Sequence, residues 1–325
     1  LANIVHHFDA VIMPRLNWPK KERKQGDRWF RALKRAGIAV IYEVDDDMFS
    51  RDFFNRLVHI HGKPEKEAAE IRESVLHTIQ GADGVTVSSQ RLATIVRRHT
   101  DKPVEVVQNY MDIEWFQSVQ QAHPRQVNGL TIGWAGGLRP DYDVEQMAIA
   151  WGRIAKRYPD VTFVIQGHQP EIIDEHVPAD RRKSIDWLPI DIYPAGLRNI
   201  DIGCCPLKNT YFNRAKTYIK AMEYATSGAA VVASPTVYGK LIEHEYDGYI
   251  ARDADEWEYA LGQLVSSTNH RKRMTQRLFD KVKREHALTD NVWRWPLAWK
   301  RIVDDFRNRR AAHSLIVPGK APVMA

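Results

Sequence analysis

The segment FNRAKTYIKAMEYATSGAAVVAS, residues 212–234, predicts a helix, a glycine stop and a buried strand in succession. Asn213 is a typical helix N-cap, Gly228 is typical of the position just after a helix, and AVVAS has the apolar character of a short buried strand. A helix N-terminus attracts anions because its first backbone N–H groups have no partner within the helix. We therefore expect this helix to begin at a phosphate-binding site.

A polar stripe follows the same helix. Lys216, Lys220, Glu223 and Ser227 are spaced four, three and four residues apart, so they share one helix face. Lys216 and the helix N-terminus would meet anionic oxygens, and Glu223, about 10 Å further along at 1.5 Å per residue, would accept hydrogen bonds from a ribose diol. Lys220 would contact the same nucleotide. The competing interpretation is a solvated helix face with an ordinary Lys220–Glu223 pair.

The segment resembles the sugar-nucleotide-binding core of retaining glycosyltransferases of the GT-B fold, the group of glycogen-synthase-like and mannosyltransferase-like enzymes. The resemblance implies that Glu223 holds the ribose of a UDP- or GDP-sugar, with a hexose as the transferred group. That family usually carries two glutamates eight positions apart, and this chain has Ala215 at the earlier position. The missing contact to the donor sugar would fall to Asn213, Arg214 or Lys216.

Length and composition predict a globular protein of two domains. The chain has 325 residues, 44% hydrophobic and 27% charged, and no apolar run long enough to span a membrane. We therefore expect a cytoplasmic protein. The two cysteines, Cys204 and Cys205, are adjacent in an apolar run, so we expect buried strand residues rather than a disulfide or a zinc site.

The net charge of +6 favours polyanionic partners, namely nucleotide phosphates, anionic lipid surfaces or nucleic acid. The basic clusters themselves are typical of solvated helix faces. Charge alone does not choose among these partners.

The first half of the chain alternates strands and helices, which predicts a mostly parallel, doubly wound sheet. We expect strands at 9–14, 38–44, 84–89 and 103–109, with helices at 27–37, 65–82 and 90–99. A first strand with a glycine-rich turn is missing, which favours an N-terminal domain truncated before Leu1. Residues 107–111 resemble the end of the N-terminal domain in the same glycosyltransferases.

The second half repeats the pattern after a polar stretch, 117–128, that has the composition of a linker. We expect strands at 129–137, 161–167, 184–189 and 201–207, with helices at 144–159 and 192–199. The predicted domains are a Rossmann-like acceptor domain, 1–118, and a Rossmann-like nucleotide-sugar domain, 129–290. In the GT-B fold the closing segment, 291–325, supplies a helix that crosses back to the first domain, and a tail.

Three further stretches contribute candidate residues for the donor site. Gly136 and Gly137 end a strand and permit the close backbone approach that a diphosphate needs, although a plain turn has the same sequence. The resemblance implies that Arg139 neutralises the leaving diphosphate, against the alternative of an exposed loop arginine. It also implies that Trp187 and Leu188 contact the nucleotide base, and core packing is the competing interpretation of Trp187.

Three aspartates, 45–47, follow the strand at 38–44 and lie at the carboxyl edge of the predicted sheet, where α/β sites occur. Asp45 and Asp47 have the spacing of the metal-binding pair of the GT-A fold. Alternatively Asp46 faces the acceptor and orders its hydroxyl, which the order of elements favours. A third interpretation is a cap for the following helix. We expect no metal.

The resulting hypothesis is a retaining glycosyltransferase that moves a sugar from a nucleotide-diphosphate sugar to an acceptor hydroxyl. Lys216 and Arg139 would stabilise the leaving diphosphate, with Asp46 on the acceptor side. Two alternatives stay open: a glycosyltransferase whose acceptor is a modified DNA base, and a GT-B-fold binding protein without turnover.

Overall fold

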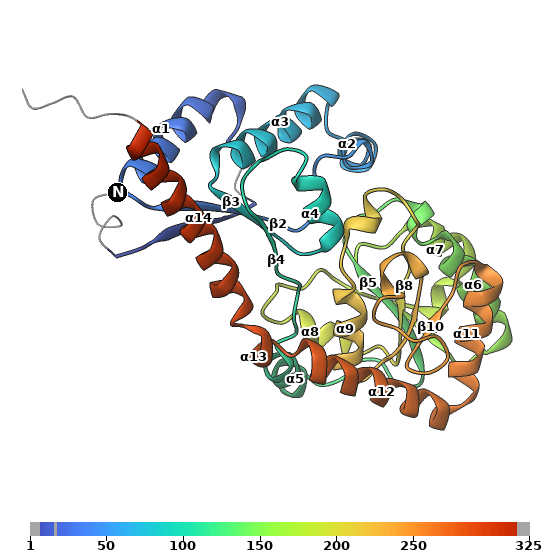
Figure 1. Ribbon diagram of the computed structural model, residues 1–325. Helices are drawn as coiled ribbons and strands as arrows, with labels where there is room; N and C mark the ends of the chain where they lie inside the picture. Colours follow the sequence, from blue (N-terminus) through green and yellow to red (C-terminus); the bar gives the residue numbers. More distant parts are fainter. Residues whose placement is uncertain (1–6, 16–17, 317–325) are drawn as a thin grey trace, which may run out of the picture. The chain divides into compact units, whose positions relative to one another are not determined.

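A computed structural model describes residues 7–15 and 18–316 and divides them into two α/β units (Figure 1). The first unit consists of the segment that ends at Phe54, Lys63–Gln108 and the segment that begins at Val292. The second consists of Asn55–Gly62 and Asn109–Asn291. None of the helices described is long and apolar enough to cross a membrane.

The first unit has a parallel sheet of four strands in the order β1-β2-β3-β4 among the described residues. These are β1 (Ala10–Pro14), β2 (Ala39–Val44), β3 (Gly84–Val87) and β4 (Val104–Val106). The helices of this part of the chain are α1 (Arg23–Arg35), α2 (Arg51–His59), α3 (Glu65–Gly81) and α4 (Gln90–Val96). The predicted parallel sheet with alternating strands and helices is confirmed.

The closing helix α14 (Arg294–Ile316) packs on the sheet of the first unit. Ile302 is fully buried there, and a Cβ added at Gly84 of β3 would lie 2.5 Å from its side chain. Glycine at position 84 therefore lets the helix approach the strand. Residues 317–325, at the end of the predicted closing segment 291–325, lie outside the described residues.

The second unit has a parallel sheet of six strands in the order β10-β9-β8-β5-β6-β7, again among the described residues. The strands are β5 (Thr131–Gly136), β6 (Thr162–Gly167), β7 (Arg182–Ile185), β8 (Ile202–Cys205), β9 (Ala230–Ala233) and β10 (Tyr249–Ile250). The order reverses between β5 and β8. Ligands of open α/β sheets bind at the carboxyl ends of the strands beside such a reversal.

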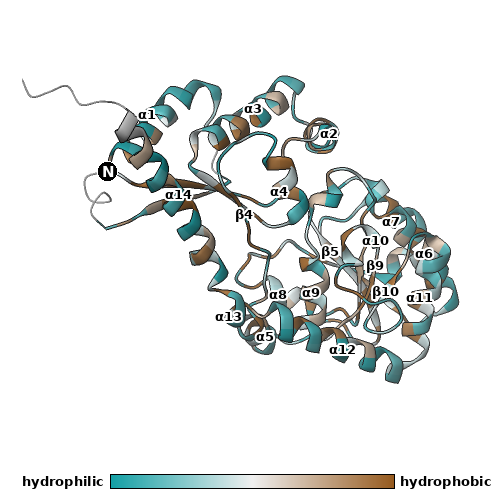
Figure 2. Cartoon of the chain, viewed as in Figure 1, coloured by the Kyte–Doolittle hydropathy of each residue, from teal (hydrophilic) through white to brown (hydrophobic). Residues whose placement is uncertain are grey.

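Helices cover both faces of this sheet. They are α5 (Ile113–Ala122), α6 (Glu145–Arg157), α7 (Glu171–His176), α8 (Tyr193–Leu197), α9 (Ile219–Thr226), α10 (Pro235–Tyr238), α11 (Ala254–Ser266), α12 (Thr268–His286) and α13 (Leu288–Asn291). Successive strand residues enter different cores, so Cys204 packs with Trp151 of α6 and Cys205 with Met222 of α9. Figure 2 shows the matching hydropathy, with polar residues on the outer helices such as α12 and apolar residues inside.

Both cysteines are buried strand residues, as predicted, and form no disulfide. Burial raises the pKa of Cys204 to about 12 and also raises the pKa of Cys205.

Two helices depart from the predicted pattern. The stretch predicted to be a linker is helical up to Ala122, because Asp112 caps α5 by accepting a bond from the Trp115 backbone N–H (3.0 Å) and Phe116 is buried. The predicted first-domain limit at residue 118 thus falls inside a helix of the second unit. Helix α2 was predicted only through the cap interpretation of residues 45–47, without bounds, and the hydroxyl of Ser50 accepts a bond from the Phe53 N–H (3.2 Å) in its first turn.

Candidate functional site

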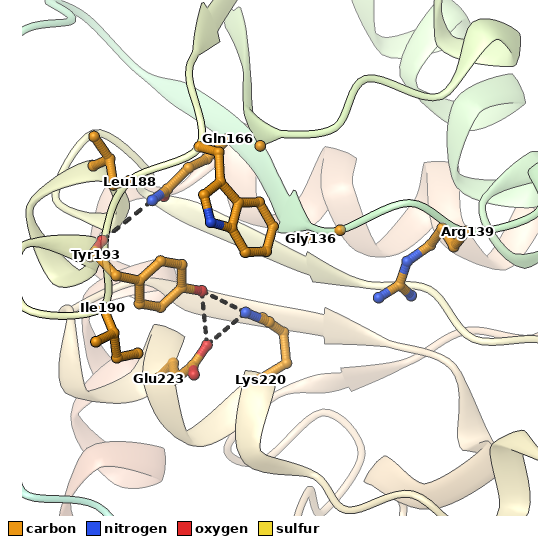
Figure 3. Close-up of a pocket in the computed structure, with 11 residues that line it drawn as sticks. Gly136, Arg139, Gln166, Leu188, Ile190, Tyr193, Lys220 and Glu223 are labelled. Atoms are coloured by element: carbon orange, nitrogen blue, oxygen red, sulfur yellow. Dashed lines mark hydrogen bonds and ion pairs between the residues drawn. The ribbon is translucent and has the colours of Figure 1, made fainter. Parts of the chain in front are cut away.

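A cavity of about 340 Å³ opens at the carboxyl ends of β5 and β6 in the second unit (Figure 3). The sequence predicted seven of its lining residues, which are Gly136, Gly137, Arg139, Trp187, Leu188, Lys220 and Glu223. It missed four, which are Gln166, Gly167, Ile190 and Tyr193. The cavity thus brings together predicted residues from three separate stretches of the sequence. It lies beside the point where the strand order reverses.

The helix that carries Lys220 and Glu223 begins later than predicted. Helix α9 starts at Ile219, and residues Asn213–Ala215 form a separate 3-10 turn. Lys216 follows that turn in extended conformation (φ −67°, ψ 170°), so the prediction that it occupies the first turn of the helix is wrong. The helix-dipole argument therefore does not apply to Lys216, whereas Lys220 does lie in the first turn.

Asn213 is not the N-cap, because its side chain belongs to a buried network. Its amide donates to the Asp143 carboxylate (2.7 Å) and to the Lys208 carbonyl (2.9 Å). Its side-chain oxygen accepts from Arg56 (3.1 Å), which also pairs with Asp143 at 2.7 Å. Asn213 is fully buried. It therefore anchors the loop before α9, and this geometry gives no support to its predicted direct contact with a ligand.

The end of α9 follows the prediction. Gly228 has φ +77°, in the left-handed region that favours glycine. Its N–H donates to the Ala225 carbonyl (3.1 Å), and the Ala229 N–H donates to the Tyr224 carbonyl (2.9 Å). These two bonds form a Schellman motif, which satisfies the last carbonyls of the helix. The chain then enters β9, the predicted apolar strand.

Glu223, Lys220 and Tyr193 form a closed hydrogen-bonded triangle in the cavity (Figure 3). The Lys220 ammonium lies 2.6 Å from Glu223 Oε2 and 2.5 Å from the Tyr193 hydroxyl, which donates to the same Oε2 at 3.0 Å. The Lys220–Glu223 ion pair that the competing interpretation named is therefore present. Glu223 Oε1 accepts no hydrogen bond from the part of the chain that the structure describes.

The charges in this triangle are strongly held. Burial raises the pKa of Tyr193, and the Glu223 carboxylate raises it further, so the phenol stays neutral. Burial lowers the pKa of Lys220, but the attraction of Glu223 outweighs it, so the net change is upward and the ammonium stays charged. Tyr193 is thus a neutral hydrogen-bond donor and Lys220 a cation at any physiological pH.

The glycines that line the cavity do so for different reasons. A Cβ added at Gly136 would lie 2.5 Å from the Trp134 ring, and one added at Gly167 would lie 2.5 Å from the Gly136 carbonyl. Gly167 also has φ +91°. At Gly137 an added Cβ would make only ordinary contact with Trp187 (3.5 Å). Side chains are therefore excluded at Gly136 and Gly167, which leaves backbone exposed to a ligand.

Arg139 brings a second cation to the cavity. Its guanidinium lies over the Trp134 ring at 5.3 Å, and Figure 3 shows it pointing into the cavity. It forms no ion pair with a described residue, and its buried Nε has no hydrogen-bond partner among them. Lys216 is described but is not one of the residues that line the cavity. Its ammonium lies over the Phe212 ring, 4.5 Å from the ring centroid.

Trp187 forms an exposed wall of the cavity. It is 71% exposed, so the interpretation of Trp187 as a core residue is wrong. Ile190 is 78% exposed, and Leu188 completes an apolar surface with them. Exposed apolar side chains on a cavity wall mark a surface that a ligand can cover.

For two of the missed residues, Gly167 and Tyr193, the sequence differs in whether it indicates a place in the site. Gly167 ends β6 as Gly136 ends β5, and the two are register partners, so a strand-end glycine was the available signal. Tyr193 carries no such signal, because only the packing of α8 brings it to Glu223.

The three aspartates lie in the first unit, where two of them share one partner and the third has another role. Asp45 and Asp46 both pair with Arg15, the second at 3.0 Å. Asp47 is buried and accepts bonds from the Phe49 and Ser50 backbone N–H groups (both 3.1 Å), and burial raises its pKa. Asp47 thus caps the turn before α2, which matches the cap interpretation for that residue. Within residues 7–15 and 18–316, no group of three or more His, Cys, Asp and Glu side chains is placed to hold a metal.

Comparison with known proteins finds a family model that matches part of the chain. Residues 129–267 match the model of the family "Glycosyl transferases group 1". The chain is 29% identical over 177 residues to the putative teichuronic acid biosynthesis glycosyltransferase TuaH of Bacillus subtilis (strain 168), a match over 50% of the chain and 43% of that protein. The chain therefore spans less than half the length of this curated relative.

Solved structures show the same fold. HepE of Anabaena in complex with UDP-glucose superposes with a TM-score of 0.61 and 16% identity, covering 96% of this chain and 81% of that one. Sucrose-phosphate synthase of Thermosynechococcus elongatus gives 0.60 and 10%, covering 90% and 73%. TarM of S. aureus gives 0.57 and 11%, covering 81% and 51%. The predicted α/β architecture of two Rossmann-like parallel-sheet domains, as in the GT-B fold, is confirmed.

Proposed function

We propose, from the premise that residues 129–267 form a domain of the glycosyl transferases group 1 family, that this protein transfers a sugar from a nucleoside-diphosphate sugar to an acceptor hydroxyl. One observation carries the proposal. One cavity at the strand-order reversal contains three polar or aromatic groups. They are an oxygen of Glu223 and the cation Arg139, which have no hydrogen-bond donor and no ion-pair partner, respectively, among the described residues, and the exposed ring of Trp187. These are the groups that a ribose, a diphosphate and a base require.

The nucleotide would lie across the carboxyl ends of β5 and β6. Glu223 Oε1 would accept a ribose hydroxyl, because a carboxylate oxygen next to an ion pair is a strong acceptor. The base would lie against Trp187, and the backbone exposed at Gly136 and Gly167 would approach the diphosphate. UDP-glucose is the ligand of HepE, and its chemistry fits these contacts.

Transfer would depend on stabilising the leaving diphosphate. Negative charge grows on the leaving oxygen as the sugar bond breaks, and fixed cations lower the barrier by meeting that charge without reorganisation. Arg139 and Lys220 line the cavity and are the candidates for this role. Lys216, in the loop before α9, is a further candidate that does not line the cavity. Because these cations replace the task of a divalent ion, the proposal includes no metal.

Two finer features belong to the same proposal. Transfer proceeds with retention of anomeric configuration, by attack of the acceptor on the face that the diphosphate leaves, which needs no protein nucleophile. The donor sugar is a hexose held without the usual first glutamate, since Ala215 occupies that position.

The test is nucleotide binding by a charge-neutral variant. We expect Glu223→Gln to weaken the binding of UDP or GDP about tenfold, because a hydrogen bond to a charged acceptor is worth about twice one to a neutral acceptor. Titration calorimetry in the presence of EDTA measures this loss and the metal independence together. Glu175→Gln on α7, an exposed glutamate outside the cavity, is the matched control and should bind as the wild type does.

The same preparation separates an enzyme from a binding protein. Slow release of free sugar from a bound UDP- or GDP-sugar without acceptor, reduced in Glu223→Gln, is expected of an enzyme. Unchanged nucleotide affinity in Glu223→Gln would remove the proposed site, and tight binding with no sugar release or transfer would remove the proposed activity.

A further inference from the structure

We propose that Tyr193 is a positioning residue that locks the Glu223 carboxylate and presents its Oε1 as the single oxygen open to the ligand, so that Tyr193 sets the selectivity of the site for ribose. The inference rests on the proposed function, because it assigns the ligand of Oε1 as a ribose hydroxyl. It concerns a residue that neither the motif around α9 nor its spacing marks.

Both hydrogen bonds that Glu223 accepts in the triangle use the same oxygen. Tyr193 has one hydroxyl proton, which it donates to Glu223 Oε2, and its oxygen accepts from Lys220. Lys220 also donates to Oε2. A carboxylate oxygen has about two lone-pair sites, and both sites of Oε2 are therefore occupied within the protein. Only Oε1 is left to accept a hydrogen bond from a ligand.

Tyr193 also limits rotation of the Glu223 carboxylate. The last torsion of a glutamate side chain is broad and roughly two-fold, so an ion pair with a flexible lysine leaves the carboxylate plane poorly defined. The phenol of Tyr193 is attached to a rigid ring and binds Oε2 from a different element, α8. It therefore distinguishes the two oxygens of Glu223 and holds the plane in one orientation.

Tyr193 is itself held in place by the end of β6. Its backbone carbonyl accepts a bond from the side-chain amide of Gln166 (3.2 Å), which is 2% exposed at the end of β6. A Cβ added at Gly196 would lie 2.4 Å from that amide, so glycine at position 196 makes room for it. Gly196, Gln166, Tyr193 and Glu223 thus form a continuous chain of contacts from the sheet to the ligand oxygen.

The test compares two ligands in two proteins. Titration calorimetry measures the affinity of wild type and Tyr193→Phe for UDP or GDP, whichever binds tighter, and for its 2′,3′-dideoxy counterpart. We expect Tyr193→Phe to weaken the ribonucleotide about five- to tenfold and to leave the dideoxynucleotide within about twofold, because the lost bond acts only through the ribose hydroxyls. The ring is retained, and the thermal unfolding midpoint checks the fold.

Tyr249→Phe is the matched control. It likewise removes a hydrogen-bonded phenol hydroxyl, which here contacts His270 at 3.0 Å, but Tyr249 lies outside the cavity, so both affinities should stay unchanged. Equal weakening of both ligands by Tyr193→Phe would show a merely structural role, and no weakening of either would also overturn the proposal. If the wild type binds neither ligand, the proposed function fails first, and the assignment of Tyr193 fails with it.

Discussion

The two cations that line the cavity, Lys220 and Arg139, differ in whether a carboxylate already neutralises their charge. The ammonium of Lys220 lies against Glu223, so the pair together brings almost no net charge to the cavity. Arg139 forms no ion pair with the described residues and points into the same space. A guanidinium also keeps its charge at every relevant pH. Arg139 is therefore the stronger candidate for the charge that develops on a leaving diphosphate.

We expect Arg139→Met to lower kcat about a hundredfold with a smaller effect on donor affinity, because its charge matters most as the leaving group departs. Lys216→Met should have a smaller effect, since Lys216 precedes the helix rather than occupying its first turn. Steady-state kinetics with a UDP- or GDP-sugar measures both, with Arg157→Met, an exposed arginine at the end of α6, as control. The reverse order of effects would return the leaving-group role to Lys216.

At the scale of elements, the sequence was informative where local signals decide the structure. Gly228 ends α9 because its backbone conformation suits glycine, and that requirement is local. The start of α9 depends instead on Arg56 and Asp143, which hold Asn213 from positions 157 and 70 residues away. No local pattern contains that network. The helix over 113–122 was hidden for a similar reason, since its polar residue Gln120 is buried against Pro194 and Ser227.

The conformation of Gly228 has a measurable cost if glycine is replaced. A Cβ there meets nothing within 4 Å, so Gly228→Ala tests backbone conformation without a steric clash. We expect the free energy of unfolding to fall by about 1–2 kcal/mol, the usual cost of the left-handed region for a non-glycine residue. Urea denaturation of the full chain measures the change.

Gly239 provides the comparison for this substitution. It has φ −62°, and an added Cβ would make only ordinary contact with the Pro235 carbonyl (3.5 Å). Gly239→Ala should therefore change the free energy of unfolding by less than about 0.5 kcal/mol. Equal effects at both glycines would contradict the role given to backbone conformation.

At the scale of the whole molecule, both α/β units were predictable, because apolar strands alternate with amphipathic helices throughout the chain. The donor-side candidates on β5, after β7 and on α9 met in one cavity, since carboxyl ends of parallel strands share one edge of a sheet. Tyr193 and Gln166 escaped prediction because their role comes from the packing of α8 against β6, which no spacing in the sequence encodes.

The buried pair of cysteines on β8 can report the opening of the second unit through their reactivity. The chain contains only Cys204 and Cys205, so a thiol reagent has no target elsewhere. Both side chains are at most 1% exposed, and the raised pKa of Cys204, about 12, leaves almost no reactive thiolate in the native state. Iodoacetamide can therefore modify these thiols only when the centre of that sheet opens. The rate of modification thus measures how often the sheet opens.

A nucleotide that binds only the closed second unit should slow the alkylation of these cysteines. At 100 times its dissociation constant it stabilises the closed state by about 2.7 kcal/mol, which corresponds to about a hundredfold slower alkylation. Mass spectrometry of the full chain over time, with and without UDP or GDP, measures the ratio without any assay of transfer. Rapid modification of the native protein, or a rate indifferent to a nucleotide that calorimetry shows to bind, would mean that β8 becomes accessible by a local motion that the ligand does not restrain.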